Sequence, residues 1–281
     1  MGDAAVSIVH HPLVLQLGPL PLTGFGIAML AAFLIGQVVA QSVLAQRNED
    51  PNVMGDVLIA AVIGGLLGGK VYYAILTRDI TALGQRAGFV FWGGLAGGII
   101  ASFLWIRFRK LSFARISDAS AAGLAAAYAV GRTGCWAVGD DYGRAWASRF
   151  AVKFPDGAPP STVQNLISQF GQSNLAGRPA TEVVSVYPTQ LFEVAMGLVM
   201  FAILWRLRGH RHAAGWLFGV YCVLAGAERI AVEFFRAKDD RFFGPFTLAQ
   251  VIGAVFIAGG AAWMLARREG TGRTAGAAPA A

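Results

Sequence analysis

Charged residues are scarce in this sequence, where 16 acidic and 23 basic side chains make up 14% of the 281 positions. A soluble domain averages roughly 25% charged residues. Hydrophobic residues make up 56% of the chain, and the mean hydropathy is +0.55. The scarcity of charge therefore excludes an ordinary soluble domain and predicts an integral membrane protein.

Histidine and cysteine are also rare, with four and two residues. The histidines all fall in the N-terminal segment or in one loop: His10, His11, His210 and His212. No histidine is therefore expected at membrane depth. The two cysteines, Cys135 and Cys222, form neither a metal-ligand spacing nor an obvious disulfide pair. We therefore expect no metal site.

Long apolar runs dominate the rest of the chain. A helix that crosses a hydrocarbon core of about 30 Å needs about 20 mostly apolar residues, and in lipid its backbone groups must be paired within the segment. The stretches of this kind are 20–46, 53–77, 87–106, 116–138, 188–206, 214–235 and 246–266. The predicted fold is an all-α integral membrane protein, a polytopic bundle of about seven transmembrane helices that forms a single membrane domain over 1–281.

Three segments lie outside the predicted spans. The N-terminal segment lacks a basic region before a short apolar core, so it does not resemble a cleaved signal peptide, and we expect it at the membrane surface. Residues 139–187 are rich in turn-forming residues and predict an extracytoplasmic loop or subdomain between spans four and five. Residues 267–281 have the small and polar composition of a disordered tail.

The distribution of basic residues favours an N-terminus outside and a C-terminus in the cytoplasm. In this orientation the inside segments carry 11 basic residues and the outside segments 9. The margin widens when the long 139–187 loop is discounted, because long loops are translocated largely regardless of charge. The net charge of +7 fits basic residues that flank spans and meet anionic headgroups, so no nucleic-acid partner is expected.

Three basic residues remain within or at the ends of the predicted spans: Lys70, Arg132 and Arg229. Charged groups inside a span usually face the bundle interior or a water-filled cavity, so each is a candidate functional residue. Lys70 can equally extend along its aliphatic stem or pair locally. Arg229, Glu233 and Arg236 project from one face of a predicted helix. This stripe is either an ion pair that neutralises buried charge or a positive site for a phosphate, which arginine binds bidentately.

Glycines interrupt two of the apolar runs, in GGLLGGK (64–70) and WGGLAGG (92–98). Small residues three and four apart allow membrane helices to approach closely. In the second motif, Gly93 and Gly94 can also open a helical turn and present backbone N–H groups to an anion. Both interpretations remain open for this motif.

Acidic residues and a cysteine gather where span four ends, in GRTGCWAVGDDYGR. Asp140 and Asp141 form a carboxylate pair at the mouth of this span, and either can accept a proton. Cys135 is either a small buried residue or a nucleophile. Glu193, near the start of span five, is either a charge that stabilises the helix start or a catalytic group.

The order of the motifs matches a known family. The correspondence runs from PLVLQLGPLPLTGFGIAML through GGLLGGKVYYAIL, WGGLAGG and GRTGCWAVGDDYGR to YPTQLFE, ERIAVEFFR and FTLAQVIG. Together these segments resemble the prolipoprotein diacylglyceryl transferases, which are enzymes of the bacterial inner membrane. The resemblance implies transfer of the diacylglyceryl group of phosphatidylglycerol to the cysteine thiol in the lipobox of a prolipoprotein signal peptide. It implies no metal and no organic cofactor.

The resemblance also implies roles for individual residues. Arg132 in GRTG matches the family's phospholipid-binding arginine, and Arg229 and Glu233 match the polar stripe of ERIAVEFFR. Asp140 stands where the family usually has a glutamate. We expect Arg132 and Arg229 to bracket the lipid phosphate, Glu233 to orient Arg229, and Asp140 or Asp141 to accept the thiol proton. The residues expected to bind phosphatidylglycerol are Arg132, Arg229, Arg236, Gly93 and Gly94.

The chain departs from the family pattern at several polar positions. Trp92 replaces the histidine of the HGG motif, and Cys135 replaces the asparagine after GRxG. Phe25, Tyr187 and Ala225 replace a tyrosine, a histidine and a second tyrosine. These changes leave two alternatives open: a non-catalytic protein that binds phospholipid, and a related transferase with a different acceptor. A transporter is less favoured because the sequence shows no internal repeat.

Overall fold

The computed structural model describes residues 8–18, 20–85, 88–237 and 241–268. The long helices in these residues are α1 (Gly24–Gln46), α2 (Val53–Thr77), α3 (Phe91–Phe108), α4 (Phe113–Val138), α6 (Thr189–Leu207), α7 (Trp216–Glu233) and α8 (Leu248–Ala266). The short helices are α5 (Val163–Ser168), η1 (Ile80–Gly84) and η2 (Ser173–Leu175). The strands are β1 (Ile8–Val9), β2 (Val14–Leu17), β3 (Leu20–Thr23), β4 (Val152–Lys153), β5 (Arg241–Phe243) and β6 (Phe246–Thr247).

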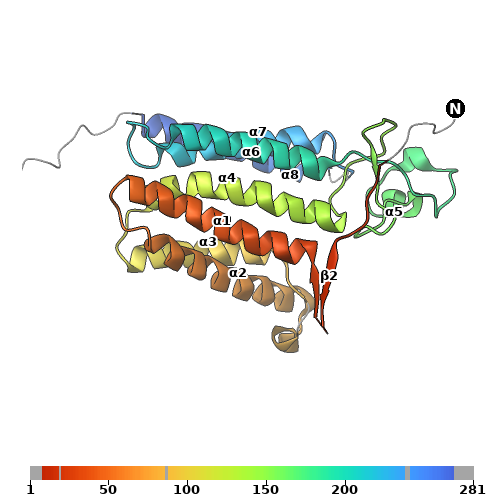
Figure 1. The fold of residues 1–281 in the computed structure, drawn as a ribbon, viewed down its shortest axis with the longest axis horizontal. Helices are drawn as coiled ribbons and strands as arrows, with labels where there is room; N and C mark the ends of the chain where they lie inside the picture. The colour runs from red at the N-terminus through yellow and green to blue at the C-terminus, as the bar shows by residue number, and fades with distance from the viewer. Residues whose placement is uncertain (1–7, 19, 86–87, 238–240, 269–281) are drawn as a thin grey trace, which may run out of the picture.

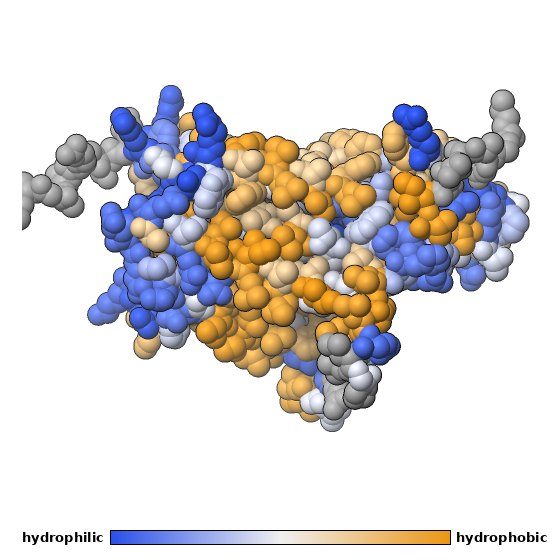
Figure 2. All heavy atoms as spheres, viewed as in Figure 1, coloured by the Kyte–Doolittle hydropathy of each residue, from blue (hydrophilic) through white to orange (hydrophobic). Residues whose placement is uncertain are grey.

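Each predicted apolar stretch coincides with one long helix, so the prediction of an all-α membrane fold is confirmed. Helices α1, α2, α3, α6 and α8 are long and apolar enough to cross a membrane. Helices α4 and α7 carry more charged residues, among them Arg132 and Glu228. A broad band of hydrophobic surface separates two hydrophilic ends of the molecule (Figure 2). That all seven long helices cross the membrane stays a prediction.

Helix α4 lies at the centre of the bundle (Figure 1). It packs against α1 on one side and against α6 and α7 on the other, while α8 packs against α7. Twelve of its residues are buried, most of them alanine or glycine, and these small side chains let three helices approach its backbone. Because α4 is surrounded by protein, it can carry charged groups that a lipid-facing helix would not tolerate.

The first span begins later than predicted. Residues 20–23 form strand β3, which pairs with β2, and α1 begins only at Gly24. The hydroxyl of Thr23 accepts a hydrogen bond from the backbone N–H of Gly26 at 3.2 Å and caps the helix. Pro21 fits the strand and cannot continue a helix toward the N-terminus without losing a backbone donor. Hydropathy alone did not distinguish this apolar strand from the helix.

Helices α2 and α3 form a hairpin held by the two glycine motifs. A methyl group added at Gly64 or Gly68 of α2 would meet backbone atoms of Gly97 or Gly93 of α3. The two backbones are therefore in direct contact, as the spacing of small residues predicts. Close helix packing accounts for both motifs.

Replacing Gly97 with alanine will destabilise this hairpin by about 1–3 kcal/mol, the usual cost of overpacking a tight contact. The new methyl group would lie 2.9 Å from the Cα atom of Gly68 and still closer to the Gly64 carbonyl oxygen, and backbone atoms cannot move aside as a flexible side chain can. Unfolding of the purified protein in detergent measures the effect. Gly259→Ala in α8 is the control, because a methyl group there meets nothing within 4 Å; equal stability of both variants would contradict the packing argument.

Residues 139–187 form a packed lobe at one end of the bundle (Figure 1). Its core contains Tyr142, Phe154, Leu166 and Val186, each at most 2% exposed. Strand β1 from the N-terminal segment pairs with β4 in this lobe. The predicted loop is therefore a folded unit. The placement of this lobe outside the membrane stays a prediction. Residues 1–7 of the N-terminal segment, which is predicted to lie at the membrane surface, are outside the described residues.

A buried carboxylate organises the opposite end of the bundle. Asp118 of α4 is fully buried and accepts a hydrogen bond from the backbone N–H of Phe218 at 3.0 Å. His210 Nε2 lies 3.2 Å and Arg47 Nη1 3.5 Å from its second carboxylate oxygen. This cluster ties the end of α1 and the α6–α7 connection to α4.

Of the tail predicted over 267–281, only Arg267 and Arg268 lie within the described residues.

Candidate functional site

Arg132 forms the centre of a charged cluster where α4 meets the lobe. Its Nη1 donates to Asp141 Oδ2 at 2.9 Å, and its Nη2 pairs with Oε2 of Glu193. The Arg132 side chain is 12% exposed and that of Glu193 only 3%. A charge this deeply buried needs a partner to offset its desolvation, and Arg132 has two.

Arg236 completes the cluster from the other side. Its Nη2 lies 2.7 Å from Asp141 Oδ1, and its Nη1 lies 3.8 Å from Glu193 Oε1. The two guanidinium groups therefore share both carboxylates, and Asp141 lies between them. Among the described residues, Nε of Arg132 has no hydrogen-bond partner, so one buried donor of this pair remains unused.

The YPTQ segment positions the loop that carries Asp141. Asp141 has a left-handed backbone, with φ of +53°, a conformation that aspartate tolerates better than most residues. Thr189 donates its hydroxyl to the carbonyl oxygen of Asp141 at 2.7 Å, and Gln190 Nε2 donates to that of Asp140 at 2.5 Å. These bonds hold the loop against the start of α6, next to Glu193.

Gly143 allows the segment after α7 to reach the same loop. The backbone of Gly143 lies opposite that of Arg236 in an antiparallel bridge, and its N–H donates to the carbonyl oxygen of Tyr187 at 2.8 Å. A side chain at this position would meet the Phe235 carbonyl oxygen and the Cβ atom of Tyr187. The glycine is therefore required for Arg236 to approach Asp141.

Asp140 and Asp141 differ in chemistry although they are adjacent. Burial and then the neighbouring charge of Asp141 raise the pKa of Asp140 to about 6, against the opposing effect of the arginines. Burial opposes ionisation of Asp141 too, but Arg236 and Arg132 outweigh it and lower its pKa to about 2. Of the two predicted proton acceptors, Asp140 is the one with a useful basicity near neutral pH.

Cys135 lies beside this pair. Arg132 Nη1 donates to its sulfur at 3.2 Å, and its sulfur lies within 4.8 Å of carboxylate oxygens of Asp140 and Asp141. Three such donors resemble a metal-ligand set in composition. However, both oxygens of Asp141 already bind guanidinium groups, and two positive charges in contact with the set oppose a cation. The donor set does not fit a metal, and the arginines favour an anion.

Arg229 and Glu233 form a separate pair on α7. Arg229 Nη2 lies 2.8 Å from Glu233 Oε2, and the arginine side chain is 33% exposed. Among the described residues, Arg229 and Arg132 share no acidic partner. Helix α7 ends at Glu233, so the predicted three-residue stripe is wrong: Arg236 lies beyond the helix and turns toward Arg132 instead.

The other predicted residues lie in structural roles. The N–H of Gly94 donates to the carbonyl oxygen of Val90 at 3.0 Å, so α3 contains no opened turn there, and Gly93 packs against α2. Lys70 donates to the carbonyl oxygen of Gln85 at 2.5 Å and lies 4.5 Å from the ring centre of Phe89, which fits the local-pairing alternative.

Two polar residues of the site were not among the predicted ones. The hydroxyl of Tyr128 lies 3.2 Å from Glu193 Oε1 and 2.8 Å from Glu228 Oε1, and both glutamates are buried. Glu228 lies inside a span, so the cost of burying a charge could have marked it from the sequence. Glu193 is one of the candidates from the sequence, and its contact with Arg132 favours a role in the site over that of a charge that stabilises the helix start.

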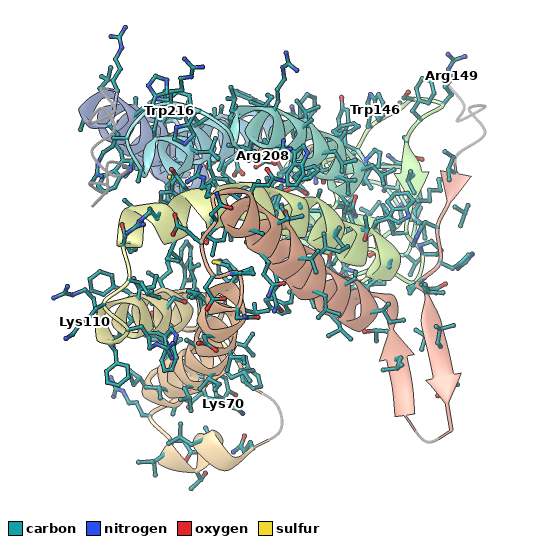
Figure 3. All side chains as sticks on the ribbon, turned by 60° about the vertical axis from the view of Figure 1, so that its left-hand side comes forward. Lys70, Lys110, Trp146, Arg149, Arg208 and Trp216 are labelled. Atoms are coloured by element: carbon teal, nitrogen blue, oxygen red, sulfur yellow. The ribbon has the colours of Figure 1, made fainter. Side chains whose placement is uncertain are left out.

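Besides Cys135, two further departures from the family pattern lie at defined places in the structure. Trp92 is half exposed and packs edge-on against Phe91. Tyr187 stacks on Trp146, with ring centres 4.2 Å apart and planes 9° apart. Trp146 lies at the lobe end of the molecule, away from Trp216 and Lys110 (Figure 3). Tyr187 therefore stabilises the lobe, and neither side chain is in the ion-pair cluster.

Comparison of the sequence with known proteins identifies its family. The model of the prolipoprotein diacylglyceryl transferase family matches residues 12–266. The chain belongs to this family. Relatives named phosphatidylglycerol–prolipoprotein diacylglyceryl transferase occur in Corynebacterium diphtheriae, with 27% identity over 92% of both chains, and in Xanthomonas oryzae pv. oryzae, with 29% identity over 92% of this chain and 91% of the relative. A third, from Stenotrophomonas maltophilia, is 29% identical over 92% of both chains.

Membership of the prolipoprotein diacylglyceryl transferase family identifies the protein as a transferase. Together with its apolar helices it indicates a multi-pass protein of the bacterial inner membrane. The matched residues include every long helix, the lobe and the cluster around Arg132. The predicted recognition, fold class and enzyme class are thus confirmed.

Proposed function

We propose that the protein transfers the diacylglyceryl group of phosphatidylglycerol to the lipobox cysteine of a prolipoprotein. The substrate sulfur attacks the glycerol carbon that bears the phosphate, the carbon–oxygen bond breaks, and glycerol phosphate leaves. The product is a thioether, and the thiol proton passes to a base. Lipoprotein maturation in the inner membrane is the resulting cellular role.

The pair of guanidinium groups on Asp141 is the observation that carries this proposal. Arg132 and Arg236 lie within 2.9 Å and 2.7 Å of the same carboxylate, so the two guanidinium groups are held close to one point. Arginine binds phosphate through two parallel hydrogen bonds, and the unused Nε of Arg132 is a free donor. Donors fixed before the reaction stabilise the charge that develops on the departing phosphate.

Asp140 is the group we assign as proton acceptor in place of the family's histidine. It follows α4 directly, next to the arginine pair, and its Oδ1 has no hydrogen-bond partner among the described residues. Cys135 is buried and accepts from Arg132, so a structural role suits it better than that of nucleophile. The acceptor thiol is supplied by the prolipoprotein.

The orientation that suits this reaction places the lobe outside and the C-terminus in the cytoplasm. The described ends of the chain lie at opposite ends of the bundle, because β1 pairs within the lobe while Arg267 donates to Ala214 in the α6–α7 connection. A membrane-impermeant maleimide applied to intact spheroplasts will label Ala180→Cys, an exposed lobe position. Labelling only after membrane disruption would show that the lobe lies in the cytoplasm and would contradict this orientation.

The decisive experiment uses purified protein in phosphatidylglycerol-containing detergent micelles with a synthetic lipobox peptide. Mass spectrometry will detect a peptide that carries a thioether-linked diacylglyceryl group. The same peptide with serine in place of cysteine is the control. Bound phosphatidylglycerol without product would favour a lipid-binding protein, and product only with another thiol peptide would favour a different acceptor.

Activity will depend on pH through the ionisation of Asp140. Because burial raises its pKa to about 6, the base form is lost as the pH falls through 6, and activity falls with it. Asp140→Asn removes this acidic limb of the pH–activity profile, so the activity of the variant will follow ionisation of the thiol itself, near pH 8.5. At neutral pH its activity will be about 10² to 10⁴-fold lower than that of the wild type. Rates measured from pH 5 to 9 test this. An unchanged acidic limb in Asp140→Asn would exclude Asp140 as the base.

A further inference from the structure

The polar cluster around Arg132 and Tyr128 contains more acids than bases. Full ionisation of its side chains would leave a net charge of −2, counted over two arginines and four carboxyl groups: Arg132, Arg236, Asp140, Asp141, Glu193 and Glu228. Uncompensated negative charge is costly at low dielectric, and it would repel an anionic phosphate. Protonation of a buried carboxyl group of the cluster would reduce this excess.

Hydrogen-bond counting points to one such carboxyl group. The hydroxyl of Tyr128 contacts Glu193 Oε1 at 3.2 Å and Glu228 Oε1 at 2.8 Å. A tyrosine hydroxyl has one proton to donate, and an ionised carboxylate can only accept. This hydroxyl can satisfy only one of two ionised glutamates, whereas a protonated glutamate can donate to the hydroxyl and leave the hydroxyl's own proton for the other.

The surroundings of the two glutamates decide which one is neutral. Glu193 pairs with Arg132 and lies 3.8 Å from Arg236, and these positive charges favour its ionised form. The hydrogen bond that Glu228 makes among the described residues is to Tyr128. The neighbouring Arg229 forms its ion pair with Glu233, and α8, which packs on α7, contains no titratable residue.

We propose that Glu228 is a neutral carboxylic acid that donates its proton to Tyr128, which in turn donates to Glu193. The three groups form a directional line of hydrogen bonds that ends at Arg132. In this line every donor has an acceptor, as buried polar groups require. Tyr128 and Glu228 are positioning residues: they orient Glu193, and Glu193 orients the phosphate-binding guanidinium. The consequence for activity rests on the proposed function, whereas the protonation of Glu228 does not.

Infrared difference spectroscopy tests the protonation directly. The spectrum of the purified wild-type protein at neutral pH minus that of Glu228→Gln will contain the carbonyl stretch of one protonated carboxylic acid. Glu182→Gln is the matched control, because Glu182 is partly exposed and paired with Arg178, so its difference spectrum will contain only ionised carboxylate bands. A carboxylate band in place of the acid band for Glu228 would overturn the proposal.

The transferase assay tests the positioning role. Glutamine has the shape of a neutral glutamic acid and can donate through its amide, so Glu228→Gln will retain activity within about threefold of wild type. Tyr128→Phe and Glu228→Ala each break the line and leave a buried partner unsatisfied, so activity will fall about tenfold or more. A Glu228→Gln variant as impaired as Glu228→Ala would show that the charge is needed and would contradict the proposal.

The two readouts separate failure of this proposal from failure of the proposed function. If the wild type yields no thioether product, the infrared test still decides the protonation of Glu228. Binding of phosphatidylglycerol then replaces turnover as the measure of positioning, with the same order expected among the variants. An acid band in the difference spectrum together with equal lipid binding by Tyr128→Phe and wild type would reject the positioning role alone.

Discussion

Replacing Arg132 with glutamine will reduce transferase activity by at least about 10² to 10³-fold, the usual effect of removing a preorganised charge at the site where negative charge develops. Arg132 contacts both Asp141 and Glu193, so its loss also leaves two carboxylates facing the phosphate. Both effects oppose binding of an anionic lipid. Thioether formation by purified variants, with phosphatidylglycerol binding measured beside it, checks the result.

Two further variants make the Arg132 experiment interpretable. Arg132→Lys keeps the charge but cannot pair with both carboxylates in the planar geometry of a guanidinium, so it will recover only part of the activity. Arg115→Gln is the control at the other end of the bundle, where the arginine is more than half exposed and 3.7 Å from its partner Glu49. Full activity of Arg132→Gln would reject the phosphate site.

The cluster around Arg132 could be predicted only in part, because its members come from distant parts of the chain. Arg132 and Asp141 are nine residues apart and both lie near the end of one span, so a local motif brings them together. Glu193 and Arg236 reach them through tertiary packing. The predicted stripe of Arg229, Glu233 and Arg236 assumed that helical spacing continues to Arg236, whereas α7 ends at Glu233 and the chain turns toward Gly143.

The helices themselves follow from hydropathy with small errors at their ends. Strand β3 contains two leucines and runs directly into α1, so hydropathy did not separate them, and Thr23 as the capping residue was the available local signal. The contact between Tyr128 and Glu228 could not be predicted, for another reason. Their hydrogen bond joins residues 100 positions apart, and only the packing of α4 against α7 brings them into contact.

Replacing Asp118 with alanine will destabilise the protein by about 3–5 kcal/mol, the cost of removing one partner from a buried ion pair. The substitution leaves Arg47 and His210 without their carboxylate and the N–H of Phe218 without its acceptor. Because Asp118 has no exposed surface, water cannot replace these bonds without opening the bundle. Denaturant-induced unfolding in detergent, followed by tryptophan fluorescence, measures the loss.

The same substitution separates stability from catalysis, because the Asp118 cluster and the Arg132 cluster lie at opposite ends of the bundle. Asp118→Ala molecules that remain folded at low temperature will therefore turn over at the wild-type rate. Asp118→Asn keeps an acceptor for the Phe218 N–H and will lose less stability than alanine. Asp50→Ala, at an exposed position near the same end, will change stability by no more than about 1 kcal/mol. A slow but fully stable Asp118→Ala protein would contradict this division and would place Asp118 in the catalytic machinery.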